Sequence, residues 1–253
     1  MRLSRGALKV WRRNFESWKV FALSFLVAAI GNPLLYLLAI GYGLGRYVAD
    51  VDGVPYAVFL APGLLAAAAM NSASFETTFG SFTRLSEQHT YEAILATPCS
   101  VADIVAGDIL WAATKSAMAT GVVLVVVTLA GLVRSPYGLA VVPVGFLTGC
   151  CFGALGMVVT AKARSYNFFD YYFTLGVSVM FFFSGVFFPL AGLPGWAQWV
   201  AWWMPLTHAV ALCRALVVGT LSLALLAHVA WLALATAGVF ALAERLVRRR
   251  LVV

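Results

Sequence analysis

Four polar side chains stand inside long apolar stretches of the sequence, where a charge or an amide needs a partner. They are Asn71, Glu76, Asp108 and Lys115. Helical spacing places Asp108 and Lys115 on one face together with Trp111. Because an unpaired ion is costly in hydrocarbon, we predict that Glu76 or Asp108 neutralises Lys115. The alternative is that the long Lys115 side chain reaches the membrane interface by itself.

Histidines and glycine-rich stretches form no recognisable catalytic or nucleotide site. His89, His208 and His228 lie in different segments, and local spacing shows no carboxylate pair and no Ser-His-Asp set. The sequence contains no GxxxxGK[ST] loop, which would cradle ATP phosphates. Its four cysteines form no CxxC pair. We predict no catalytic residue, cofactor or metal in this chain, although distant residues could still converge into a membrane-embedded lipid-modifying enzyme.

One short amphipathic helix is predicted in the hydrophilic stretch that separates two apolar runs. Tyr91, Ile94 and Leu95 share a helical face, Glu92 lies beside that face, and Pro98 ends the helix. A helix of this kind docks into the groove of a cytosolic partner or lies on the lipid surface. The sequence alone leaves both readings open.

Aromatic residues gather over residues 189–216. Proline and glycine interrupt this segment, and four of the eight tryptophans lie in a stretch of eight residues inside it, 196–203. Because tryptophan favours the membrane interface, we predict an outer segment that dips into the bilayer without crossing. It is either an interfacial anchor or a gate that stacks on an amphiphile. The candidate gate residues are Phe187, Phe188, Trp196, Trp199, Trp203 and His208.

Composition identifies the class of protein that must position these groups. Hydrophobic residues make up 62% of the 253-residue chain, charged residues 11%, and the mean hydropathy is +0.93. A soluble domain carries about 45–50% apolar and about 25% charged residues. Such a composition excludes soluble, disordered and disulfide-scaffold classes. The chain is therefore predicted to be an all-α integral membrane protein.

The apolar runs predict one membrane domain over residues 1–253 with six transmembrane helices. Spans one to five occupy residues 20–188, and the sixth occupies residues 221–243. A basic, aromatic segment over residues 1–19 is predicted as an amphipathic helix on the membrane surface. The five spans before the outer segment are predicted at about residues 20–45, 56–80, 104–133, 137–161 and 168–188, and the glycines spaced for close packing in the fourth span are Gly149, Gly153 and Gly156.

Charge distribution sets the predicted orientation. The formal net charge is +7, and thirteen of the 17 basic residues, Arg2 among them, fall at the predicted inner side. Only Arg46 and Arg134 fall in predicted outer loops, the first of which also carries Asp50 and Asp52. This positive-inside bias predicts that both termini are cytoplasmic. It also accounts for the basic balance without any binding of nucleic acid.

The order of these elements resembles the permease subunit of bacterial ABC-2 type exporters along the whole chain. Within that family it is most similar to the permeases of nodulation-factor exporters, which move lipochitooligosaccharides. The stretches that carry the resemblance are Val10–Phe15, Phe75–Thr77, Asp103–Asp108 with Trp111–Lys115, Gly156–Ala161 and Pro205–His208.

What the resemblance implies is an ATP-driven exporter of the bacterial inner membrane. Two copies of this chain would pair with two copies of a cytosolic ABC ATPase, which would bind ATP and Mg. The helix of Tyr91, Glu92, Ile94 and Leu95 would transmit ATPase motion, and an amphiphilic glycolipid would leave between the two permease chains, which membrane lipid surrounds. Residues of the dimer seam or pathway would be Gly31, Pro33, Phe173 and Phe181.

Other functions compatible with the same sequence pattern are export of a drug or of a lipid-linked polysaccharide. A membrane scaffold that binds partners without transport is a further alternative. The layout of spans is shared by drug and polysaccharide exporters, so it does not choose among the substrates.

Overall fold

The computed structural model describes residues 5–48, 50, 51 and 53–251. Over those ranges the regular secondary structure is helical, apart from an isolated β-bridge between Val51 and Val54. Two residues used in the predictions, Arg2 and Asp52, lie outside the described residues. The α-helices are α1 (Gly6–Trp18), α2 (Ala22–Tyr36), α3 (Tyr56–Phe75), α4 (Thr90–Leu95), α5 (Val101–Leu129), α6 (Val141–Lys162), α7 (Phe168–Tyr171), α8 (Ser178–Phe183), α9 (Gly195–Trp202), α10 (Pro205–Val218) and α11 (Leu225–Leu251).

Shorter helical turns join or extend these helices. Because several of them continue directly from an α-helix, the continuous helices are longer than their α-helical parts. Tight 3-10 turns cover Lys19–Phe21, Leu44–Arg46, Pro136–Ala140 and Leu190–Gly192, and wider π turns cover Leu37–Gly43, Glu76–Gly80, Thr83–Glu87 and Tyr172–Val177.

The all-α membrane architecture is confirmed. In the described residues, five continuous helices are long and apolar enough to cross a membrane. The bent pair α9 and α10 meets at 86° and would make a sixth if counted as one span. The five are Gly6–Arg46, Tyr56–Glu87, Val101–Leu129, Pro136–Lys162 and Leu225–Leu251.

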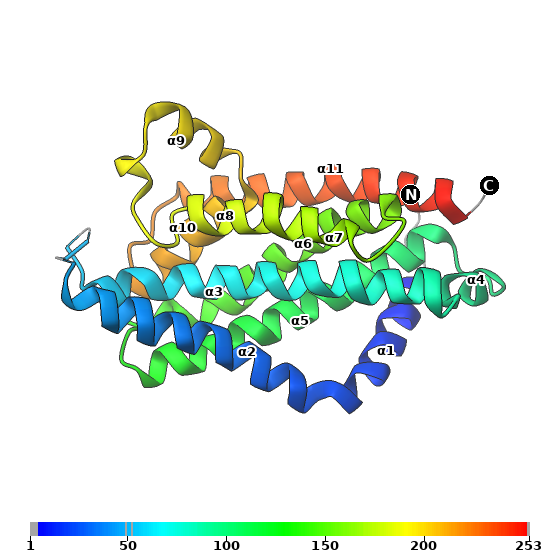
Figure 1. Cartoon of the computed structure of the whole chain (residues 1–253), viewed down its shortest axis with the longest axis horizontal. Helices are drawn as coiled ribbons and strands as arrows, with labels where there is room; N and C mark the ends of the chain where they lie inside the picture. Colours follow the sequence, from blue (N-terminus) through cyan, green and yellow to red (C-terminus); the bar gives the residue numbers. More distant parts are fainter. Residues whose placement is uncertain (1–4, 49, 52, 252–253) are drawn as a thin grey trace.

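Figure 1 shows an elongated bundle in which α3, α5 and α6 run alongside one another. Helix α4 and the C-terminal part of α11 lie at one end, here called the α4 end, and α9 projects at the opposite end, the α9 end. The apolar stretch of the span that contains α3 is 78% buried, against 11% for the span of α2 and 6% for α11. Helices α2 and α11 therefore present most of their apolar surface outward.

Close packing of α5 against α6 depends on a glycine of the predicted glycine-rich span. A Cβ added at Gly149 would lie 2.7 Å from the Cα of Ala113 and 2.6 Å from the Cβ of Ser116. Such short separations do not occur between real side chains, so the helices can approach this closely only without a side chain at position 149. The predicted role of Gly149 in close helix packing is confirmed.

Three predicted boundaries were wrong. The second span does not end near residue 80, because its helix continues through two π turns to Glu87. The fifth is shorter than predicted: Phe168–Phe183 is about 24 Å long at 1.5 Å per residue, below the ~30 Å hydrocarbon core. The last helix begins at Leu225 and continues to Leu251. Polar residues remain helical in both extensions, which an apolar-run criterion does not detect.

One face of helix α1 packs on the protein. Its residues Ala7, Val10 and Asn14 are buried, and a Cβ on the facing Gly107 of α5 would lie 2.8 Å from the carbonyl oxygen of Ala7. The indole of Trp11 donates to Thr114 Oγ1 at 3.0 Å. The 3-10 turn that follows α1 then redirects the chain into α2, and the two helices form a V (Figure 1).

Candidate functional site

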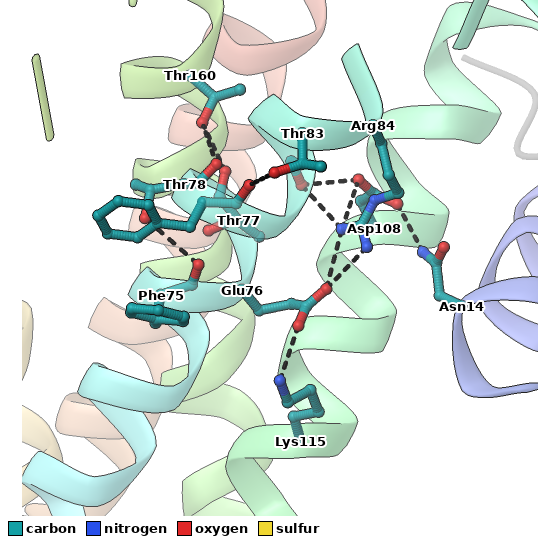
Figure 2. Close-up of polar contacts among 12 residues, drawn as sticks. Asn14, Phe75, Glu76, Thr77, Thr78, Thr83, Arg84, Asp108, Lys115 and Thr160 are labelled. Atoms are coloured by element: carbon teal, nitrogen blue, oxygen red, sulfur yellow. Dashed lines mark hydrogen bonds and ion pairs between the residues drawn. The ribbon is translucent and has the colours of Figure 1, made fainter. Parts of the chain in front are cut away.

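A network of buried charges lies near the α4 end of the bundle. Glu76, at the start of a π turn after α3, is held between two cations (Figure 2). Lys115 Nζ of α5 lies 2.7 Å from its Oε2, and both terminal nitrogens of Arg84 donate to its Oε1 at 2.9 Å. All three side chains are at most 13% exposed. The carboxylate therefore balances two positive charges in a site that water reaches poorly.

The second carboxylate of the network, Asp108 of α5, is fully buried. Asn14 of α1 donates to its Oδ1 at 2.6 Å, and Ser81 donates to its Oδ2 at 2.7 Å. Arg84 Nη2 lies 3.3 Å from the same Oδ2, and the phenol of Tyr91 donates to it as well. Two carboxylates thus face two cations, and each carboxylate oxygen has a donor. Buried ions are tolerated when each charge has a partner and its hydrogen-bonding groups are paired in this way.

Tyr91 connects the short helix α4 to this network. Its side chain is completely buried. Burial, and then the neighbouring Asp108 carboxylate, raise the pKa of Tyr91 well above its ordinary value. The phenol therefore stays protonated and donates to Asp108. Through that bond a surface helix is joined to groups that line the interior of the bundle.

The irregular backbone after α3 is supported by threonine hydroxyls. Thr77 and Thr78 donate to the carbonyl oxygens of Ala73 and Ser74 at 2.9 and 2.7 Å. Thr160 of α6 donates to the carbonyl of Thr77 at 2.6 Å, as Figure 2 shows. A π turn inside a span is tolerated where neighbouring groups satisfy its backbone. The polar run of this span therefore serves to position Glu76 and Arg84.

The predicted partner of Lys115 is present, and it is Glu76. Asp108 is not the partner of Lys115 in the described ion pairs, and it instead faces Arg84. Asn71 does not join the network: it is exposed and donates to the carbonyl of Ala67, one turn earlier in its own helix. Of the four predicted intramembrane polar residues, the structure therefore brings three together.

Four members of the network were missed by the sequence reasoning: Asn14, Ser81, Arg84 and Tyr91. Arg84 follows the apolar run and was assigned to a hydrophilic loop. Its spacing from Glu76, across a stretch that remains helical, was the available signal. The contacts of Asn14 and Tyr91 join segments separated by 94 and 17 residues, so local periodicity carries no information about them.

The apolar face of α4 is partly covered by the chain itself. Tyr91 is buried with Leu85 and Ile104, and the half-buried Ile94 and Leu95 pack against them. Docking of this helix on a partner or on lipid stays a prediction. The exposed residues of α4 are Glu92 and Ala93, and Glu92 Oε1 lies 3.1 Å from His89 Nδ1. A partner reaching this helix from solution therefore meets Glu92 and not Tyr91.

A cavity of about 570 Å³ opens between α2, α3, α5 and the α7–α8 segment. Three of the four predicted seam or pathway residues line it, namely Pro33, Phe173 and Phe181, as do Asn71 and Lys115. The fourth, Gly31, does not line the cavity, and a Cβ added there would meet no atom within 4 Å. Phenyl rings, two asparagine amides and one ammonium make the lining amphipathic.

The predicted gate residues separate into two groups. Trp196, Trp199 and Trp203 of the α9 region are 74%, 67% and 54% exposed. His208 of α10 is buried, and its Nε2 lies 2.8 Å from the carbonyl oxygen of Trp202 in α9. Its Nδ1 lies 2.7 Å from Nδ1 of His228 in α11, and its ring stacks on Trp231 at 4.3 Å. His208 therefore joins α10 to α11, an arrangement that the sequence did not predict.

The two predicted gate phenylalanines also differ from the tryptophans. Phe187 packs edge-on against Phe181 at 4.9 Å, and its backbone carbonyl accepts a bond from Tyr56 at 2.9 Å. Phe188 is 36% exposed and lies edge-on to Phe183 at 6.5 Å. Phe187 therefore packs on Phe181, which lines the cavity, and Phe188 lies at the surface.

Groups of three or more histidine, cysteine or carboxylate side chains that could hold a metal ion are not found among the described residues. The carboxylates of the buried network face cations and hydroxyl or amide donors instead.

Comparison with known proteins shows the family to which the chain is similar. Residues 7–218 match the family model of the ABC-2 type transporter. Nodulation protein J of Rhizobium meliloti (strain 1021) is 41% identical over 245 residues, covering 96% of this chain and 93% of the relative. Nodulation protein J of Rhizobium leguminosarum bv. trifolii is 42% identical over 244 residues, covering 96% and 93%. The inner membrane transport permease YadH of Escherichia coli (strain K12) is 22% identical over 212 residues, covering 83% and 82%.

Proposed function

The chain belongs to the ABC-2 type transporter family, and from this we propose that it is the permease of an ATP-driven exporter of a lipochitooligosaccharide or a similar glycolipid. The family is one of multi-pass transport subunits, which agrees with the membrane helices described above. Support for the substrate class comes from the relatives named Nodulation protein J, which resemble this chain over nearly its whole length.

The observation that carries the substrate class is the cavity between α2, α3, α5 and α8. Its volume of about 570 Å³ falls in the ~300–1,000 Å³ range of small-molecule sites. Phenyl walls such as Phe75 and Phe173 suit an acyl chain or the face of a sugar ring, and the amides of Asn32 and Asn71 suit N-acetyl and hydroxyl groups. An amphiphile with both parts matches this lining better than a purely apolar drug.

ATP and Mg belong, in this proposal, to a separate cytosolic ATPase present in two copies. The exposed Glu92 of α4 is the proposed contact with that subunit. Movement of α4 would act on Asp108 through Tyr91, and then on Glu76 and Lys115 through Arg84. Because Lys115 lines the cavity, this chain of contacts provides a physical route from the ATPase to the substrate.

The proposed location is the bacterial inner membrane with both termini cytoplasmic. Support comes from basic side chains that contact the segment leading into α4: Arg13 donates to Thr90, Arg84 to Glu76 and Arg250 to Ser86. Positive residues are retained preferentially on the cytoplasmic side. The α9 end, with its exposed tryptophans, would then lie at the outer interface, where indoles are favoured.

A second copy of the chain is the proposed partner along α2 and α8. Large apolar side chains of both helices are exposed, including Leu23, Val27, Leu35 and Phe182. Gly31 stands on α2 without a neighbour, so another helix can approach there closely. Pairing along this surface would enclose the cavity from its open side.

Co-purification tests the hypothesis that the chain is a transporter permease. We expect this chain to purify with an ABC ATPase encoded beside it, and the complex in nanodiscs to hydrolyse ATP. Glu92→Ala should lower that hydrolysis, whereas Asp50→Ala, an exposed carboxylate substitution far away in the α9-end loop, should not. A chain that purifies alone and converts lipid unaided would contradict the proposal and favour the enzyme alternative.

Substrate choice is tested with inverted membrane vesicles that contain the complex. ATP-dependent uptake of a fluorescent lipochitooligosaccharide is expected to exceed that of a lipid-linked oligosaccharide or a hydrophobic dye. Asn71→Leu should reduce this uptake without lowering the yield of folded protein, because Asn71 bonds only to its own helix. Preference for the dye or for the lipid-linked oligosaccharide would overturn the substrate assignment while leaving the permease assignment intact.

A further inference from the structure

A second cavity lies beside α1 and shares Lys115 with the large one. Its volume is about 350 Å³, and it lies between α1, the π turns after α3, and α5. The lining residues that matter here are Arg13, Trp18, Phe21, Glu76, Arg84 and Lys115. We propose that this cavity binds the phosphodiester headgroup of an anionic phospholipid, which joins α1 to the core of the bundle.

Charge in the lining favours an anion. Arg13, Arg84 and Lys115 line the cavity; Glu76 and Asp108 balance Arg84 and Lys115, and Arg13 adds a further positive charge. The guanidinium of Arg13 donates to Asn14 Oδ1 at 3.3 Å and to Thr90 Oγ1 at 3.4 Å, both neutral acceptors at long distances. Among the described ion pairs Arg13 has no carboxylate partner. Its planar fork of donors is suited to a phosphate.

Two buried N–H groups of lining residues point to the same ligand chemistry. Trp18 Nε1 and Arg84 Nε have no acceptor among the described residues, although almost every other buried polar side-chain atom there has a partner. Buried donors are nearly always satisfied in native proteins. Phosphate oxygens are strong acceptors that can take several N–H bonds at once. One headgroup held beside these side chains would supply acceptors that the protein itself does not.

The surface beside the cavity indicates that the phosphate belongs to a lipid. Val20, Phe21 and Leu23, directly after α1, are 81%, 64% and 75% exposed. Acyl chains can lie along Val20 and Phe21, in the 3-10 turn that joins α1 to α2, while the headgroup enters beside α1. A cavity of 350 Å³ is at the lower end of the ~300–1,000 Å³ range of ligand sites, large enough for a headgroup but not for a whole amphiphile. Basic pockets between membrane helices bind lipid headgroups elsewhere.

Native mass spectrometry of the delipidated exporter complex tests the proposal. The probes are phosphatidylglycerol, phosphatidylethanolamine, diacylglycerol and inorganic phosphate. We expect phosphatidylglycerol to bind more tightly than phosphatidylethanolamine, diacylglycerol to show no specific binding, and millimolar phosphate to displace little lipid. Arg13→Gln should weaken phosphatidylglycerol binding about fivefold, the contribution of one basic residue near an anionic lipid. Arg12→Gln is the matched control because Arg12 is the exposed neighbour on the same helix.

A second substitution keeps the test independent of charge and of folding. Trp18→Phe removes one unpartnered N–H while retaining an aromatic ring, and should also weaken phosphatidylglycerol binding at unchanged yield. Equal effects of Arg12→Gln and Arg13→Gln would overturn the site, since only Arg13 lines the cavity. Displacement by inorganic phosphate at the affinity of the lipid would assign the site to a free anion instead. The proposed export activity does not enter either readout.

Discussion

The two ends of the bundle hold their helices together by different chemistry. At the α4 end, Glu76 and Asp108 face Arg84 and Lys115, and all four groups are nearly inaccessible to water. At the α9 end, the comparable junction is formed by rings: His208 stacks on Trp231 at 4.3 Å and lies beside His228. Ionic partners come from elements far apart in sequence, whereas the rings belong to the last two helices.

This difference bears on how each end can respond to force. A buried ion pair tolerates little displacement, because separating the charges leaves each one desolvated and unpaired. Stacked rings lose little when they slide, since dispersion and hydrophobic contact are not directional. The α4 end is therefore suited to transmit a movement, and the α9 end, with Trp196 and Trp199 exposed, is suited to adapt to its surroundings.

The largest effect is expected from Asp108→Ala. This change leaves the Arg84 guanidinium with one carboxylate in place of two and removes the acceptor of Asn14, Ser81 and Tyr91. Breaking a buried charge pair typically costs about 3–5 kcal/mol. We expect a large fall in the unfolding midpoint, measured by thermal unfolding in detergent with monodispersity as the control. A shift comparable to that of an exposed substitution would show that the network is not a structural junction.

The second-largest loss of stability is expected from Gly107→Ala, because the added methyl group would push α1 away from α5. The added methyl group would lie 2.8 Å from the Ala7 carbonyl oxygen and closer still to Val10. Overpacking of this kind costs about 1–3 kcal/mol, and protease cleavage should become faster within α1. Gly121→Ala is the matched control in the same helix, since the added methyl group would meet only Val142 Cγ2, at 3.9 Å. Equal stability of the two variants would contradict the close approach.

The Glu76–Lys115 pair should be measured by a double-mutant cycle. Glu76→Gln and Lys115→Met are expected to show a coupling of about 0.5–3 kcal/mol in the free energy of unfolding. A control cycle on Glu16 and Lys19 uses a pair with the same 2.7 Å separation but with side chains about half exposed. That exposed pair should show no measurable coupling at moderate salt. Additive effects at Glu76 and Lys115 would show that the buried pair contributes nothing of its own.

The smallest effect is expected at the α9 end, from His228→Phe. The ring contact with His208 is retained, and the hydrogen bond between the two Nδ1 atoms is lost. A single neutral hydrogen bond contributes about 1 kcal/mol, and His208 keeps its bond to the Trp202 carbonyl at 2.8 Å. Thermal unfolding beside Asp108→Ala provides the comparison. A loss as large as that of Asp108→Ala would remove the distinction between the two ends.

Span existence, order and approximate length were predictable, because each depends on a run of apolar residues that the bilayer requires. The pairing of Lys115 with Glu76 was also within reach, since an intramembrane lysine needs an anion. Arg84 was not, because the π turns that keep its segment helical depend on support from Thr160 in another helix. The burial of Tyr91 on the inward face of α4 was not predictable either, since an amphipathic pattern does not show what covers the apolar side of a helix.

The sequence by itself determined that this chain is a helical membrane protein, and its basic residues marked one side as predicted cytoplasmic. Both properties follow from composition and from position along the chain, which need no knowledge of contacts. Only the tertiary structure decided which charges meet, that α1 packs on Gly107, and that Lys115 stands between two cavities. Those contacts join residues tens of positions apart, and they form only when the packed helices exclude water and leave each polar group to find a partner.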